Sequence, residues 1–239
     1  MTITRTNTAA VLNTTNNQNN YQSAAASPAA NALLSMWVGL SDTVAPDDPA
    51  VTNSPWALSW TKQFTLLHTD GIKRLTLFTA TTVAAPGSDT FDILFTNNAT
   101  GCLMRMTQWT DSSGSAPTLV QAVTDSDAAA SDVLINTLPA LGAASWVMAV
   151  AICNDTTPVA TALESWVEAF EEGFATPALG WAGYHSNGIT SDNTPSWDWT
   201  TNIAWTGGAI EVAEPVAAVA RVPRPIIVPG EAVHRASRW

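Results

Sequence analysis

Residues 195–212, PSWDWTTNIAWTGGAIEV, are the part of the sequence that most restricts the fold. Their large apolar residues share odd-numbered positions, the period of two expected of a strand with one buried face; they are Trp197, Trp199, Ile203 and Trp205. Gly207 and Gly208 follow, and apolar and polar residues then alternate over 209–212. We predict paired strands here, as a hairpin-like end to a β-domain, and therefore a structural or binding class of protein.

Short apolar runs of the kind expected for strands recur along the chain, separated by turn residues at roughly ten-residue spacing. We expect strands over residues 33–40, 56–66, 73–80, 90–96, 101–109, 119–123, 133–138, 144–152 and 179–185. The run 144–152, ASWVMAVAI, is almost wholly apolar and is the best candidate for a central strand covered on both faces. The pattern predicts an all-β chain folded as an antiparallel β-sandwich.

Residues 162–174, ALESWVEAFEEGF, have a different period. Their apolar residues at 163, 167, 170 and 174 are spaced by four, three and four, which is helical spacing, and Gly173 suits a C-terminal stop. We expect one short helix or helical turn here. The four glutamates of the segment then form its solvated face, and we prefer this interpretation to a catalytic pair of carboxylates.

Both ends of the chain differ from its middle. Residues 1–20 are rich in Thr and Asn and offer little for a core, so we expect an N-terminal arm, followed by a sandwich domain over residues 21–213. Residues 214–239 contain four prolines, which exclude a helix and favour an extended path. We expect a C-terminal docking arm whose candidate contact residues are Arg221, Arg224, Ile226, Ile227, Val228, Arg235, Arg238 and Trp239.

The charge balance limits the class of partner. The 239-residue chain has a formal net charge of −11, and residues 107–220 contain no Lys or Arg. Because binding to a phosphate backbone requires clustered Lys and Arg, we expect no nucleic-acid partner. No apolar run is long enough for a membrane-spanning helix, and the N-terminus lacks the apolar region of a secretory signal, so no membrane partner is expected either.

The two cysteines, Cys102 and Cys153, lie in apolar strand-like runs. They are either buried free thiols or, if their strands are neighbours, a disulfide. We expect no zinc site, because the three histidines show no ligand spacing to them; they are His68, His185 and His234.

Catalytic motifs are not found: the sequence lacks the phosphate-binding G-x-x-x-x-G-K-[ST], G-x-S-x-G and H-E-x-x-H. A glycosidase needs two carboxylates that flank a sugar, and spacing does not single out Asp192 and Asp198 for that role. We therefore expect no enzymatic activity, no catalytic residue, no cofactor and no bound metal.

The eleven tryptophans raise a different possibility, since exposed rings stack on sugars. Most should fill the core, and Trp181, Trp197 and Trp199 are the candidates for exposed aromatic binding.

Four segments carry a resemblance to a known family: SPAANALLSMWVGL (27–40), GSDTFDILF (87–95), CLMRMTQW (102–109) and TNIAWTGGAIEV (201–212). In the residue pattern and order of its expected strands over residues 21–213, the chain resembles the single-domain β-sandwich structural proteins of tailed-phage and prophage virions. The resemblance implies a jelly-roll-like sandwich on the outside of a virion, as a head decoration, head fibre or tail-associated protein. It supplies no catalytic residues.

We therefore expect a structural protein without enzymatic activity, made in the host cytoplasm and located on the virion. Its expected partners are capsid or tail proteins, which it meets through its terminal arms, and further copies of itself in a homo-oligomer such as a trimer. The alternative is a receptor- or glycan-binding module of a phage tail or head fibre, which predicts tryptophan side chains exposed at one loop end.

Overall fold

The computed structural model of the chain describes all residues except 1, 14–16, 53–55, 135–136, 164, 176 and 216–239. The described residues form fourteen β-strands, β1 to β14, and no helix. All pairings between these strands are antiparallel. The prediction of an all-β antiparallel sandwich is therefore confirmed.

The strands form three sheets. The N-sheet has the order β1 (Ile3–Asn13), β8 (Gly101–Asp111), β3 (Leu33–Ser41), β6 (Lys73–Thr81) and β5 (Thr61–Leu67). The C-sheet has the order β11 (Ala160–Ala162), β14 (Ser196–Ala213), β10 (Ser145–Cys153), β13 (Ala178–Ser186) and β12 (Trp166–Ala175), and β9 (Thr118–Leu134) also pairs with β14. The cover sheet has the order β2 (Gln18–Gln22), β7 (Asp92–Ala99) and β4 (Ala50–Thr52).

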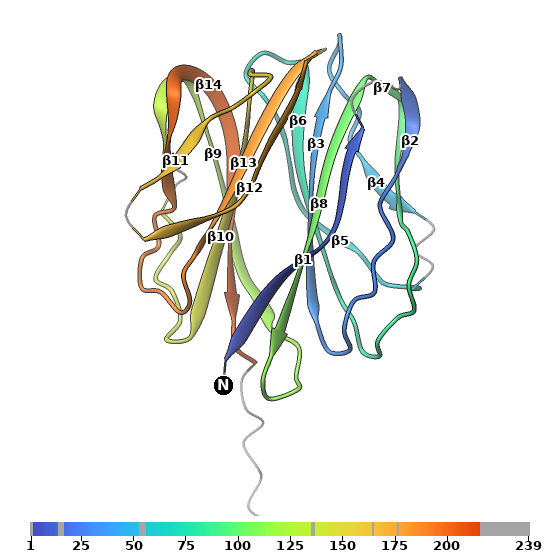
Figure 1. Ribbon diagram of the computed structural model, residues 1–239, viewed down its shortest axis with the longest axis vertical. Coiled ribbons are helices and arrows are strands. Elements are labelled where there is room, and N and C mark those ends of the chain that lie inside the picture. Colours follow the sequence, from blue (N-terminus) through green and yellow to red (C-terminus); the bar gives the residue numbers. More distant parts are fainter. Residues whose placement is uncertain are drawn as a thin grey trace, which may run out of the picture.

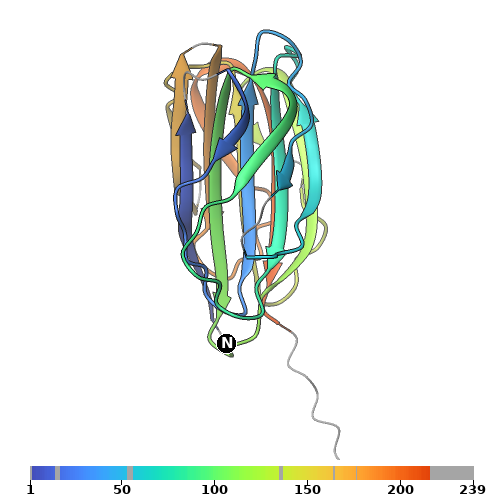
Figure 2. The same ribbon diagram turned by 90° about the vertical axis from the view of Figure 1, so that its right-hand side faces the viewer.

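The sheets are stacked, with their strands running along the long axis of the molecule (Figure 1). The N-sheet lies in the middle, with the cover sheet on one face, as the side view also shows (Figure 2), and the C-sheet on the other. Three clusters of buried apolar side chains fill the layers. The middle core lies between the N-sheet and the C-sheet, the cover core lies between the N-sheet and the cover sheet, and the outer core lies on the far face of the C-sheet.

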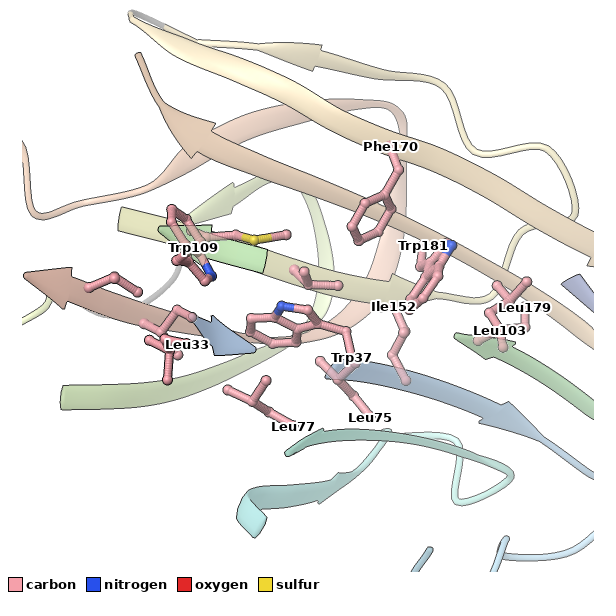
Figure 3. Packing of buried hydrophobic residues seen from close by; sticks show 14 of the residues in the cluster. Leu33, Trp37, Leu75, Leu77, Leu103, Trp109, Ile152, Phe170, Leu179 and Trp181 are labelled. Atoms are coloured by element: carbon pink, nitrogen blue, oxygen red, sulfur yellow. The ribbon is translucent and has the colours of Figure 1, made fainter. Parts of the chain in front are cut away.

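Strands between two cores are buried on both faces, as their apolar sequences require. All nine residues of β3 are buried: Trp37 projects into the middle core, while Met36 and Val38 project into the cover core. Figure 3 shows Trp37 packed among leucines of neighbouring strands and near Ile152 of the C-sheet. Strand β10 has the same two-faced burial, which confirms the prediction made from residues 144–152.

Residues 196–213 form one long strand, so the predicted hairpin is wrong. Strand β14 curves strongly near one end of the molecule (Figure 1), where its register with β9 shifts between Asp198 and Trp205. The curve brings Trp197 and Trp199 into the outer core, over the face of β10 and β13. The outer core is therefore closed by the C-sheet folding back on itself, because a bulged strand can bend where a regular one cannot.

The helix expected over residues 162–174 is also wrong, since Trp166–Ala175 is strand β12. A bulge between Glu168 and Phe170 reverses the alternation of side chains along the strand. Trp166 consequently faces the outer core and Phe170 the middle core, although they are four residues apart. Apolar positions on two faces, displaced by the bulge, produced spacing that resembled a helix.

The expected N-terminal arm is largely a strand. Residues Ile3–Asn13 form β1, which pairs with β8 along the edge of the N-sheet, and Ile3 is buried in the middle core. The ordered fold therefore begins about twenty residues earlier than the predicted boundary at residue 21. The strand expected over 119–123 lies within β9, but β9 ends at Leu134, so only the first two residues of the strand expected over 133–138 belong to it.

Candidate functional site

The three tryptophans proposed as exposed rings are buried, and that prediction is corrected. Trp181 and Trp197 have 0% of their surface exposed, and Trp199 has 4%. Trp181 packs on Phe170 in the middle core, with 4.7 Å between ring centroids (Figure 3). Trp197 stacks on Tyr184 at 4.8 Å. These rings fill the interior, because alternation along a strand does not show whether a second layer covers its other face.

The candidate residues of the C-terminal arm lie outside the described residues; they are Arg221, Arg224, Ile226, Ile227, Val228, Arg235, Arg238 and Trp239. The described chain ends at Pro215, two residues after the end of β14. The last residue of that strand, Ala213, pairs with Thr118 at the start of β9. The arm therefore begins beside the first residues of β9.

A charged cluster around the buried side chains of His68 and Lys73 lies at the turn between β5 and β6. The Lys73 ammonium, with no exposed side-chain surface, forms a salt bridge with Asp70. His68 Nδ1 lies 3.0 Å from the Asp70 carboxylate, and His68 Nε2 lies 3.1 Å from the Ala204 carbonyl oxygen on β14. Burial by itself raises the pKa of Asp70, but the bonds from Lys73 and the Ile72 N–H outweigh it and hold the pKa below its ordinary value. The cluster ties this turn to the bend of β14.

A buried carboxylate belongs to Glu211 on β14. It accepts hydrogen bonds from the Gly142 N–H at 2.8 Å, from the Gln121 side-chain amide at 2.5 Å and from the Ser145 hydroxyl. These donors come from β9, the loop before β10, and β10 itself. Because several donors compensate the buried charge, we interpret Glu211 as a structural anchor for that loop.

A third polar contact crosses the middle core near its β1 edge. Arg105 on β8 forms a salt bridge with Glu172 on β12, and its guanidinium lies 5.4 Å from the centre of the Phe170 ring. The Trp181 indole N–H donates to the other oxygen of Glu172 at 3.2 Å. The glutamate expected on the wet face of a helix therefore joins the two main sheets.

Both cysteines are free and buried, which agrees with the first of the two alternatives. Cys102 lies in the cover core and Cys153 in the outer core, on opposite sides of the middle core. Among the described residues, no group of three or more His, Cys, Asp or Glu is placed to hold a metal ion. The described residues also include no helix long and apolar enough to cross a membrane.

Two open clefts lie around the end of β6. The first cleft, of about 580 Å³, runs between Trp56–Ser59, the Thr79–Thr81 end of β6 and the exposed turn at residues 83–86. The second cleft, of about 550 Å³, lies between that same end of β6 and the start of β9. Neither lining includes an Asp, Glu, Lys or Arg. The half-buried Trp56 contributes to the first cleft, and its Ala57 neighbour has a φ of 50°, which is unusual for a residue with a side chain.

The second cleft adjoins a free strand edge, which is the candidate interaction surface of the molecule. Strand β9 pairs with β14 on one side, and no other described strand pairs with it. Val120, in the wall of the second cleft, has 53% of its surface exposed. A free edge presents unpaired N–H and C=O groups that can accept another strand. Sequence reasoning missed this edge, because the pairing of strands distant in sequence has no local signal.

The chain matches no family model, no curated protein and no solved structure.

Proposed function

We propose that this chain is a structural protein of the exterior of a tailed-phage virion, without enzymatic activity, that attaches as a head decoration or head/tail-associated protein. In this proposal it is a jelly-roll-like sandwich that forms homo-oligomers and docks through its C-terminal arm. The resemblance described above supports the virion assignment. The N-terminal segment expected to share in docking forms β1, so the proposal assigns docking to residues 214–239.

The observation that carries the proposal is the free edge of β9 together with the two clefts beside β6, whose linings contain no charged side chain. The buried charged side chains of Lys73 and Glu211 bond to groups of the fold itself. The exposed features are instead the free edge of β9 and two clefts lined by hydroxyl, amide and apolar groups. Surfaces of this kind suit protein contacts, since charged side chains are depleted at the centres of interfaces.

The test is incorporation into particles. Deleting residues 215–239 should leave a folded sandwich that no longer joins particles, because β14 ends at Ala213. Occupancy would be measured by quantitative mass spectrometry of purified particles, with circular dichroism to confirm folding. The exposed-loop substitution Ile189→Ser serves as the control, and its occupancy should match that of the parent chain. Normal occupancy of the folded deletion variant would refute docking through the arm.

A glycan-binding module is the second candidate, and the first cleft is the observation that favours it. Trp56 lies there with Ser59, Thr61, Thr79 and Thr81, a combination of ring face and hydroxyls suited to a neutral sugar. A glycan array should then give hits that Trp56→Ala abolishes. Trp146→Phe, at a partly buried residue packed against the middle core, should retain them. An array without hits for the folded parent protein would rule against this candidate.

A further inference from the structure

We propose that the free edge of β9 receives the C-terminal arm of a second copy of this chain, which adds to the C-sheet as an extra strand over residues 222–228. The inference rests on the docking role proposed for the arm, and it identifies a second copy of the chain as a partner of the arm. The acceptor is the part of β9 that lines the second cleft, residues 118–122.

The acceptor edge has room for a strand. The second cleft separates the start of β9 from Gln63 on β5 and from Thr79 and Thr81 on β6. Strand β6 continues past the start of β5, because Thr61 of β5 pairs with Thr79. An added strand would therefore bond to β9 along its backbone and place side chains against Leu119, Val120 and Thr81, the exposed last residue of β6.

The arm has the sequence of an edge strand. Its prolines at 223, 225 and 229 are all odd-numbered. In an extended chain, the backbone groups of alternate residues point to the same side, so these prolines would all face away from an acceptor. The even-numbered residues keep an N–H for the acceptor; they are Val222, Arg224, Ile226 and Val228. Proline on the outward side also stops further strands from adding.

The geometry of the exit and the charges favour a second copy as the donor. The arm leaves beside Thr118, and the seven residue-to-residue steps from 215 to 222 can span roughly 25 Å, several times the spacing between strands. Two copies with these edges facing each other can each donate an arm and accept one, as a closed oligomer requires. Residues 1–215 carry nineteen acidic and five basic side chains, so two bodies repel each other. Residues 216–239 of the arm carry four Arg and one Glu, so an arm placed between the two bodies reduces this repulsion. Asp125 and Asp127, farther along β9, are acidic groups on the same strand.

A pair of proline substitutions tests strand addition in the full-length chain. Ile226→Pro removes an N–H that would face β9, whereas Ile227→Pro adds a proline to the side that already carries three. The mass of the particle in solution would be followed against concentration by sedimentation velocity. We expect Ile226→Pro to raise the dissociation constant of the oligomer at least roughly tenfold more than Ile227→Pro does. Equal effects of the two substitutions would overturn the proposal.

A matched pair of substitutions also tests the acceptor edge. Val120 and Val159 are equally exposed, at 53% and 52%, but only Val120 lines the second cleft. Val120→Asp should convert the oligomer to monomer and Val159→Asp should leave it intact, and an excess of a peptide of residues 216–239 should also dissociate it. The proposal would be overturned if the parent chain were a monomer and Ile226→Pro nevertheless changed the rate of hydrogen exchange at residues 118–122. The arm would then bind to β9 of its own chain and not to a second copy. If Ile226→Pro lowers particle occupancy but not oligomerisation, this inference fails while docking through the arm stands.

Discussion

The ring of Phe64 on β5 lies directly against the backbone of Gly208 on β14. A Cβ atom added at Gly208 would lie 2.9 and 3.0 Å from two ring carbons and closer still to a third. The contact joins the edge strand of the N-sheet to the strand that closes the C-sheet, next to the free edge of β9. Glycine is required here by packing, since its φ does not fall in the left-handed region.

We predict that Gly208→Ala destabilises the fold by about 1–3 kcal/mol, the usual cost of overpacking, because the ring must move out of the middle core. Urea denaturation would measure the change. Gly87→Ala is the matched control, since a Cβ there meets nothing within 4 Å, and its cost should be small. Phe64→Leu in the Gly208→Ala background should recover part of the loss. Equal stability of the parent and Gly208→Ala would contradict this packing.

The salt bridge between Arg105 and Glu172 should matter more than a surface pair. Their side chains are 17% and 27% exposed, so Glu172→Ala leaves a guanidinium with little access to water and removes the acceptor of the Trp181 N–H. We expect a loss of about 1–3 kcal/mol, less than for a fully buried pair because water still reaches both groups.

The pair of Lys62 and Asp48 provides the control, since its side chains are 31% and 49% exposed. Asp48→Ala should cost less than about 1 kcal/mol. Chemical denaturation of both variants would compare them, and a smaller loss for Glu172→Ala than for Asp48→Ala would show that the contact across the middle core contributes little.

The stability of the protein should fall as the pH drops below about 6.5. Burial, and then the nearby positive charge of Arg5, lower the pKa of His185 from its ordinary value of 6.5. Between the folded-state pKa and 6.5 the unfolded chain binds more protons, so acidification favours unfolding. His185 also stacks on Trp146, and its Nδ1 lies 2.7 Å from the Ser186 carbonyl oxygen.

Urea midpoints measured from pH 7.5 down to 5.0 would test this dependence. His185→Gln should lose much of the slope in that interval, although it lowers the overall stability by removing the stacked ring. A slope that is the same in both proteins would show that another group is responsible.

Both thiols should be unreactive in the native protein. Burial raises the pKa of Cys102, and burial followed by the charge of Asp155 raises the pKa of Cys153 to about 12. The thiolate is the reactive form, so a disulfide reagent at pH 8 should label neither residue until the chain unfolds. Labelling in denaturant should then give two thiols per chain. Rapid reaction of one thiol under native conditions would show that its sheet opens locally.

Sequence predicted the interior better than it predicted the surface. The apolar run at 144–152 identified β10 almost to the residue, because a strand covered on both faces needs no polar positions. Burial on both faces also explains why the predicted exposure of Trp181, Trp197 and Trp199 is wrong. Their exposure depended on whether another layer covered that face of the sheet. A bulge in β12 defeated the helix prediction, since register is decided by the partner strand and not by the strand's own sequence.

By itself, the sequence determined that this chain is all-β, with apolar strands separated by turns, an acidic body and a basic, proline-rich C-terminal segment. These properties are local or additive, so they can be counted along the chain. Only the tertiary structure decided that residues 196–213 are one curved strand, that their tryptophans close the outer core, and that β9 keeps a free edge beside the origin of the arm. Such features depend on pairing between residues far apart in the sequence, and the free energy of that pairing comes from contacts that no single segment contains.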